Sequence, residues 1–123
     1  MRMSPTGAYT WFASMGSFLQ GTITLFTSLI PNMIPSHSLL NITIGLIGFA
    51  ALRFGGAIGP QRYALLFGLF YVAFAIAGAF SGHPMGLGLL PADHYIHAVL
   101  GVFGLCAVAA DSIWARAASR SGA

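Results

Sequence analysis

The sequence predicts an all-α membrane protein: one domain, residues 1–123, in which four transmembrane helices form a bundle. Hydrophobic residues make up 57% of the chain and charged residues only 6%, whereas a soluble protein carries roughly 25% charged residues. So few charges cannot cover a water-facing surface, and lipid must therefore be a large part of the solvent. Four apolar segments, separated by proline- and glycine-rich turns, supply the spans, and arginines occur at or near the segment ends.

The four predicted spans follow one another along the chain. A membrane-spanning helix needs about 20 mostly apolar residues, and the segments that meet this need cover about residues 9–30, 35–52, 63–80 and 94–110. The first contains no charge and exceeds the roughly 7–15 apolar residues of a signal peptide, so we expect a retained span. Pro31 and Pro35 bracket a tight turn after it. A glycine- and proline-rich linker, 54–61, precedes the third span, and Asp111 marks the expected exit of the fourth.

The placement of the basic residues predicts the orientation. With four spans, every one of them falls on the side that also holds both termini; they are Arg2, Arg53, Arg62, Arg116 and Arg120. Under the positive-inside rule this side is cytoplasmic, and we expect a bacterial inner-membrane protein with both termini in the cytoplasm. The arginines are scattered rather than clustered with aromatic residues, so no nucleic-acid partner is expected. The expected partners are membrane lipid and other membrane-protein subunits.

Spans two and four share a pattern in residues 41–48 and 97–104: a polar residue precedes a glycine by four positions, and a second glycine follows three later. Helical spacing puts these residues on one face, where small residues allow helices to approach closely in lipid. Both spans run in the same direction, so a tandem duplication of a two-helix hairpin is one interpretation, and chance similarity is the other. The predicted helix-packing residues are Asn41, Gly45, Gly48, Gly68, His97, Gly101 and Gly104.

These motifs resemble a bacterial family of small four-helix membrane proteins of unknown function. The segments that carry the resemblance are Leu39–Leu52, Arg62–Gly78 and Leu89–Ala109. The family has a His-x-x-x-Gly-x-x-Gly pattern in its second and fourth helices, an Arg-x-Tyr start to the third, and an Ala-Asp-x-x-x-His entry to the fourth. Residues 92–97 match that entry, whereas Asn41 stands where the second helix usually has histidine. The resemblance implies the fold and no activity.

The histidines are the main candidates for chemistry, and all are predicted on or near the non-cytoplasmic face; they are His37, His83, His94 and His97. Imidazole is the commonest metal ligand, and together with nearby methionine sulfur it suits copper. Ligation of a haem or chlorophyll-type pigment by His97 is a further hypothesis. The preferred interpretation is structural: Asn41 and His97 hydrogen-bond across the bundle, and Asp93 caps the start of the fourth span.

No arrangement typical of an enzyme is visible. No serine has a paired histidine and acid, Cys106 is flanked by apolar residues, and the glycines of 55–59 lack the lysine of a phosphate-binding loop. We therefore expect an accessory or structural subunit that packs against a larger respiratory or photosynthetic membrane assembly. The alternatives are a periplasm-facing metal- or tetrapyrrole-binding protein that uses His94 and His97, and a small oligomeric transporter or channel.

Overall fold

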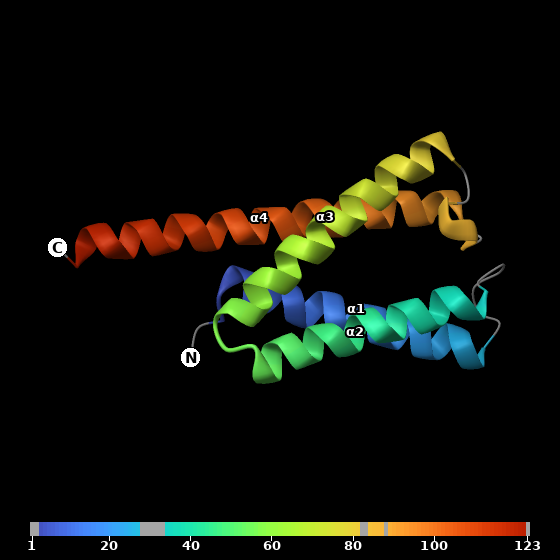
Figure 1. Ribbon diagram of the computed structural model, residues 1–123, viewed down its shortest axis with the longest axis horizontal. Helices are drawn as coiled ribbons and strands as arrows, with labels where there is room; N and C mark the ends of the chain where they lie inside the picture. The colour runs from blue at the N-terminus through green and yellow to red at the C-terminus, as the bar shows by residue number, and fades with distance from the viewer. Residues whose placement is uncertain (1–2, 28–33, 82–83, 88, 123) are drawn as a thin grey trace.

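The computed structural model describes residues 3–27, 34–81, 84–87 and 89–122, and these residues are organised almost entirely as helices (Figure 1). The elements are α1 (Pro5–Phe26), α2 (Pro35–Phe54), α3 (Ile58–Phe80), the short 3-10 helix η1 (Pro84–Gly86) and α4 (Pro91–Ser121). The predicted all-α class with four long helices is confirmed.

Three of the four long helices are both long and apolar enough to cross a membrane: α2, α3 and α4. This agrees with the second, third and fourth predicted spans and indicates a membrane protein. The helix α1 has 22 residues but is less apolar than the other three. The reason is a row of hydroxyl side chains on the side of α1 that faces the bundle, namely Thr6, Thr10, Ser14, Ser17 and Thr24, all of them buried.

Three helices begin earlier in the chain than the predicted spans: α1 at Pro5, α3 at Ile58 and α4 at Pro91. The helix α1 begins at Pro5 because the Ser4 hydroxyl caps it, accepting a hydrogen bond of 3.0 Å from the Gly7 N–H, and because proline suits the first helical position. The helix α3 begins at Ile58 rather than at residue 63, so the linker is shorter than expected. Pro60 falls in the first turn of α3, where its missing N–H breaks no helical hydrogen bond.

The helix α4 continues past the predicted fourth span, as far as Ser121. Asp111 lies inside the helix rather than at its exit, and its carboxylate accepts a short hydrogen bond from the Thr6 hydroxyl of α1. The alanine-rich stretch that follows favours continuation of the helix. The last turns project past the ends of the other helices in Figure 1.

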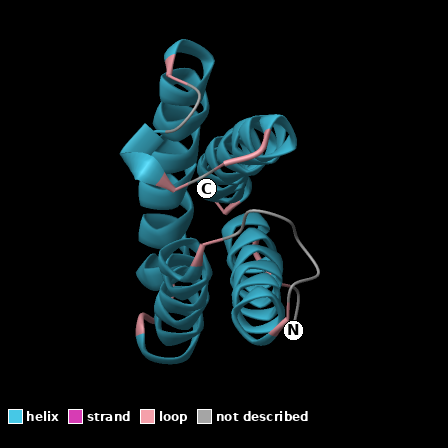
Figure 2. Ribbon diagram, turned by 90° about the vertical axis from the view of Figure 1, so that its right-hand side faces the viewer, coloured by secondary structure: helices cyan, strands magenta, loops and turns pink. Residues whose placement is uncertain are grey.

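The helices form two antiparallel hairpins, α1–α2 and α3–α4, each packed along its length. In Figure 1, α3 crosses the molecule diagonally, and both termini lie at the same end as the α2–α3 turn. Figure 2, turned by 90°, shows the α1–α2 pair below the α3–α4 pair. Over the described residues, α2 and α4 do not pack directly against each other, so contact between the hairpins depends on α1 and α3.

Side-chain hydrogen bonds join the two hairpins. The Tyr9 hydroxyl of α1 donates to the Leu100 carbonyl of α4 at 3.0 Å. The Thr10 hydroxyl donates to the carbonyl of Pro60 in α3 at 3.2 Å. These bonds satisfy polar groups inside the bundle, which is a requirement for any group that is shielded from water.

Glycines bring α1 and α2 into close contact. A Cβ atom at Gly45 would lie 2.6 Å from the Phe18 Cβ and 2.7 Å from the Ser14 carbonyl oxygen. At Gly48 it would collide with the Ser14 hydroxyl and lie 2.9 Å from Cζ of Tyr63. Both glycines therefore sit where only a hydrogen atom fits between the helices.

The second hairpin is built in the same way. A Cβ at Gly101 would lie 2.7 Å from the Val72 amide nitrogen and 2.9 Å from the Gly68 carbonyl oxygen, and one at Gly68 would lie 3.2 Å from the Gly101 carbonyl oxygen. A Cβ at Gly104 would approach the Ala64 carbonyl oxygen to 2.9 Å. The three glycines thus line the contact between the backbones of α3 and α4.

Candidate functional site

Every long helix contributes a buried polar residue to the region between the two hairpins. We call this set the polar cluster; its members are Ser17 of α1, His37 and Asn41 of α2, Tyr71 of α3 and His97 of α4. The Tyr71 hydroxyl interacts with the Ser17 side chain, and His97 interacts electrostatically with His37. Asn41 lies one helical turn beyond His37, on the same side of α2.

His97 is the centre of the polar cluster. Its imidazole is stacked on the Tyr71 ring, with centroids 5.4 Å apart and planes inclined by 15°, and Phe74 meets it edge-on at 5.1 Å. The side chain is 7% exposed, and Nδ1 is buried without a hydrogen-bond partner among the described residues. A buried polar atom without a hydrogen-bond partner lowers the free energy of unfolding by about 1–3 kcal/mol. The fold therefore keeps the His97 imidazole buried despite a loss of stability.

The predicted hydrogen bond between Asn41 and His97 is absent from the described residues. Both side chains are buried, but the helices that carry them do not pack directly together. Leu40, the neighbour of Asn41, packs instead against the apolar cluster of Phe74 and the residues that precede α4. His97 packs instead on Tyr71 and Phe74 of α3, the other helix of its own hairpin, and the helix-packing role of Asn41 stays a prediction.

His94 and Asp93 lie at the start of α4. A Cβ at Gly78 would collide with the His94 ring, so the imidazole rests directly on the α3 backbone. Its Nδ1 is buried and has no hydrogen-bond partner in the part of the chain that the structure describes. Asp93 is in the first turn of α4 rather than before it, and its Oδ2 accepts a hydrogen bond of 2.7 Å from the Leu90 N–H. The carboxylate thus satisfies an amide at the positive end of the helix dipole.

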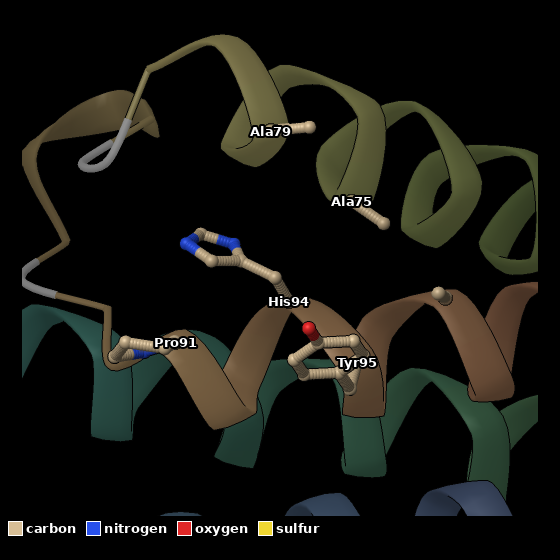
Figure 3. A pocket seen from close by; sticks show the side chains of 6 residues that line it. Ala75, Ala79, Pro91, His94 and Tyr95 are labelled. Atoms are coloured by element: carbon tan, nitrogen blue, oxygen red, sulfur yellow. The ribbon is translucent and has the colours of Figure 1, made fainter.

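A pocket of about 350 Å³ opens between α3 and α4 beside His94 (Figure 3). Small side chains make up much of its wall, and the imidazole projects from α4 into the space between the two helices. The residues that line it are Ala75, Ala79, Pro91, His94, Tyr95 and Ala98. His94 belongs to this pocket, whereas His97 belongs to the polar cluster.

The copper and tetrapyrrole hypotheses gain no support from the residues that the structure describes. Among them, no group of three or more histidine, cysteine, aspartate or glutamate side chains could hold a metal ion. His83, one of the four predicted ligands, lies outside the described residues. The His97 ring packs against Tyr71 and Phe74, and ligation of a haem or pigment by His97 stays a prediction.

The described arginines lie at the opposite end of the bundle from the histidines. Arg53 lies in the last turn of α2, with its guanidinium 5.4 Å from the centre of the Phe54 ring, and Arg62 lies in the second turn of α3. Arg116 and Arg120 lie on the projecting part of α4. Arg2 lies outside the described residues. All four described guanidinium groups belong to exposed residues.

Hydrogen bonds from Thr24 to other helices or to the backbone are expected from the sequence, but Thr6, Thr10, Ser14 and Ser17 were not predicted to share its face of α1. The buried residues of this face recur every three or four positions, which is the spacing of one helix face, and this signal was available. The hydroxyls pair within the protein: Thr24 with Ser38 of α2 at 2.8 Å, Thr10 with α3, and Thr6 with Asp111 of α4. Thr6, Thr10 and Thr24 therefore join α1 to the other three helices.

Comparison with known proteins finds no matching family model, no similar curated protein and no similar solved structure. The resemblance to the four-helix family therefore stays a prediction that depends on the motifs alone, and so does the expectation that the protein is not an enzyme.

Proposed function

We propose that all four helices cross the bacterial inner membrane, with both termini and the α2–α3 turn on the cytoplasmic side. The 22 residues of α1 extend about 33 Å at 1.5 Å per residue, enough for a hydrocarbon core of about 30 Å. The helix carries no charged residue, and its hydroxyls are satisfied inside the bundle. The described arginines cluster at the end that holds the termini (Figure 1), which is the cytoplasmic side by the positive-inside rule.

We further propose that the two hairpins arose by tandem duplication. Equivalent contacts recur with a nearly constant shift: residues of α1 correspond to α3 residues 54 positions later, and residues of α2 to α4 residues 56 positions later. The matching pairs are Ser14–Gly45 with Gly68–Gly101, and Thr24–Ser38 with Gly78–His94. Repeated contacts of this kind support descent from one hairpin more strongly than the shared glycine motif does.

The function we propose is that of an accessory subunit, which docks on a larger respiratory or photosynthetic membrane assembly. The observation that carries this proposal is the projecting end of α4. The helix has 31 residues, about 46 Å, and so exceeds the membrane core by about 16 Å. Its last turns expose Ile113 and Trp114 beside Arg116 and Arg120. Tryptophan and arginine are the residue types that dominate binding energy at protein interfaces.

The apolar outer faces of the bundle supply a second surface that suits this role. Large apolar side chains are exposed along α3 and α4, including Leu66, Leu69, Ile76, Val99 and Phe103. In a membrane these apolar faces contact lipid, and the same faces can pack against an apolar helix of another subunit.

Photo-crosslinking from position 114 tests the proposal. A photoreactive phenylalanine analogue replaces Trp114 in one variant and Leu46, an exposed residue of α2 outside the two proposed surfaces, in a matched control. We expect position 114 to form one discrete adduct with another membrane protein in native membranes. Adducts with lipid alone from position 114, at the level of the control, would overturn the docking role of the α4 end.

A further inference from the structure

The pocket beside His94 combines apolar walls with one accessible polar atom. His94 makes no hydrogen bond with the described residues, and of its two ring nitrogens only Nδ1 is both buried and unpartnered. Nδ1 faces the α3 backbone at Gly78, which leaves Nε2 as the ring nitrogen that can face an occupant of the pocket. In lipid, an imidazole N–H without an acceptor is unfavourable, so an occupant with an acceptor oxygen would stabilise this end of α4.

The shape of the pocket depends on small residues that a larger side chain would close. Gly78 lets the imidazole lie flat on the α3 backbone, because a Cβ there would collide with the ring. Ala75, Ala79 and Ala98 leave the remaining space between the two helices. The volume of about 350 Å³ falls in the range of small-molecule sites, about 300–1,000 Å³, and admits one substituted six-membered ring.

The position of the pocket restricts the ligand further. The lining residues Tyr95, Pro91 and Ala79 are exposed on the outer side of the bundle, so the pocket opens toward lipid rather than toward the polar cluster. Figure 3 places the Tyr95 ring over α4 at the edge of the pocket, while the His94 imidazole extends from α4 toward α3. An aromatic face at the rim and a hydrogen-bond donor inside suit a flat ring that bears a carbonyl group.

We propose that this pocket binds the head group of a lipid-soluble quinone, with its ring beside Tyr95, one carbonyl accepting a hydrogen bond from His94 Nε2–H, and its apolar tail in the bilayer. This inference is independent of the accessory role, since it rests on the pocket and not on the α4 end. A lipid acyl chain is the competing occupant. It would fill the apolar space but has no acceptor for the imidazole.

The test uses the full chain in nanodiscs of phosphatidylcholine and two probes, a decyl-substituted benzoquinone and decylbenzene, which lacks the carbonyls. We expect saturable binding of the quinone probe, with a shift of the His94 ring nitrogen signals in NMR spectra. His94→Phe keeps a flat ring and removes the N–H, and should weaken quinone binding by about tenfold, the effect of one lost hydrogen bond to a ligand.

Two further variants separate the outcomes. Ala98→Leu narrows the pocket without touching the imidazole, and should reduce binding of both probes. Leu66→Ala, on the exposed face of α3, should leave both unchanged. The proposal is overturned if the quinone shows no saturable binding, or if both probes bind equally and His94→Phe weakens neither, which would identify an acyl-chain groove only.

Discussion

Close packing of α3 on α4 through Gly101 makes a specific prediction about stability. In the variant Gly101→Ala, the new methyl group would lie 2.7 Å from the Val72 amide nitrogen and 2.9 Å from the Gly68 carbonyl oxygen. Optimal carbon contacts are about 3.5–4.0 Å. Because both neighbours are backbone atoms of one helix, they cannot rotate away, and α3 and α4 must separate by about 1 Å.

The magnitude follows from two opposing effects. Overpacking of this kind costs about 1–3 kcal/mol, whereas alanine is a better helix former than glycine by up to about 1 kcal/mol. We expect a net loss of about 1–2 kcal/mol in the free energy of unfolding. The matched control is Gly16→Ala, since a Cβ at Gly16 meets nothing within 4 Å and should be neutral or slightly stabilising.

The assay is unfolding of the purified chain in mixed micelles with increasing dodecyl sulfate, followed by far-ultraviolet circular dichroism. Gly101→Ala should unfold at a lower dodecyl sulfate fraction than the parent, and Gly16→Ala should not. If the two variants unfold at the same fraction, close contact of the helix backbones at Gly101 does not stabilise the hairpin, and the reasoning is refuted.

Three further predictions concern contacts between hairpins and orientation. Thr6→Val removes the hydroxyl that donates to Asp111 and should lower the free energy of unfolding by about 1–3 kcal/mol in the same assay. The control Thr43→Val, at an exposed site whose hydroxyl bonds only within its own helix, should change it little. Equal effects of the two variants would contradict a hydrogen bond that joins α1 to α4. Tyr9→Phe removes the bond to the Leu100 carbonyl and should cost about 1 kcal/mol; no change would mean that this bond does not join the hairpins. Green fluorescent protein fused to either terminus should fluoresce, and alkaline phosphatase fused there should stay inactive. Active phosphatase at both termini would contradict the cytoplasmic orientation, and activity at only one terminus would exclude four spans.

The helix count and the order of the elements could be predicted because long apolar segments and proline–glycine turns are local features of the chain. The ends of the helices depend on individual hydrogen bonds and were therefore harder to predict from the sequence. The Ser4 cap moves the start of α1 four residues earlier than expected, and Asp111, which resembles an exit signal, is instead accommodated inside α4 by Thr6.

The polar residues of the bundle could be listed from the sequence, but their partners could not. A histidine and an asparagine at equivalent places in two helices suggested a direct bond. The diagonal course of α3 puts Tyr71 against His97 instead. How two helices cross depends on tertiary packing, and the periodicity of each helix alone does not predict it. The separation of His94 from His97 has the same origin, because it depends on Gly78 in α3.

The most direct test of the accessory role is the native mass of the tagged chain after mild extraction from its own membranes, compared with a chain that ends after Ser112. We predict that the full chain migrates within a large assembly of defined composition, and that the shortened chain, still helical by circular dichroism, migrates alone. A full chain that runs as a monomer or a small homo-oligomer, with the same mass as the shortened one, would contradict the account.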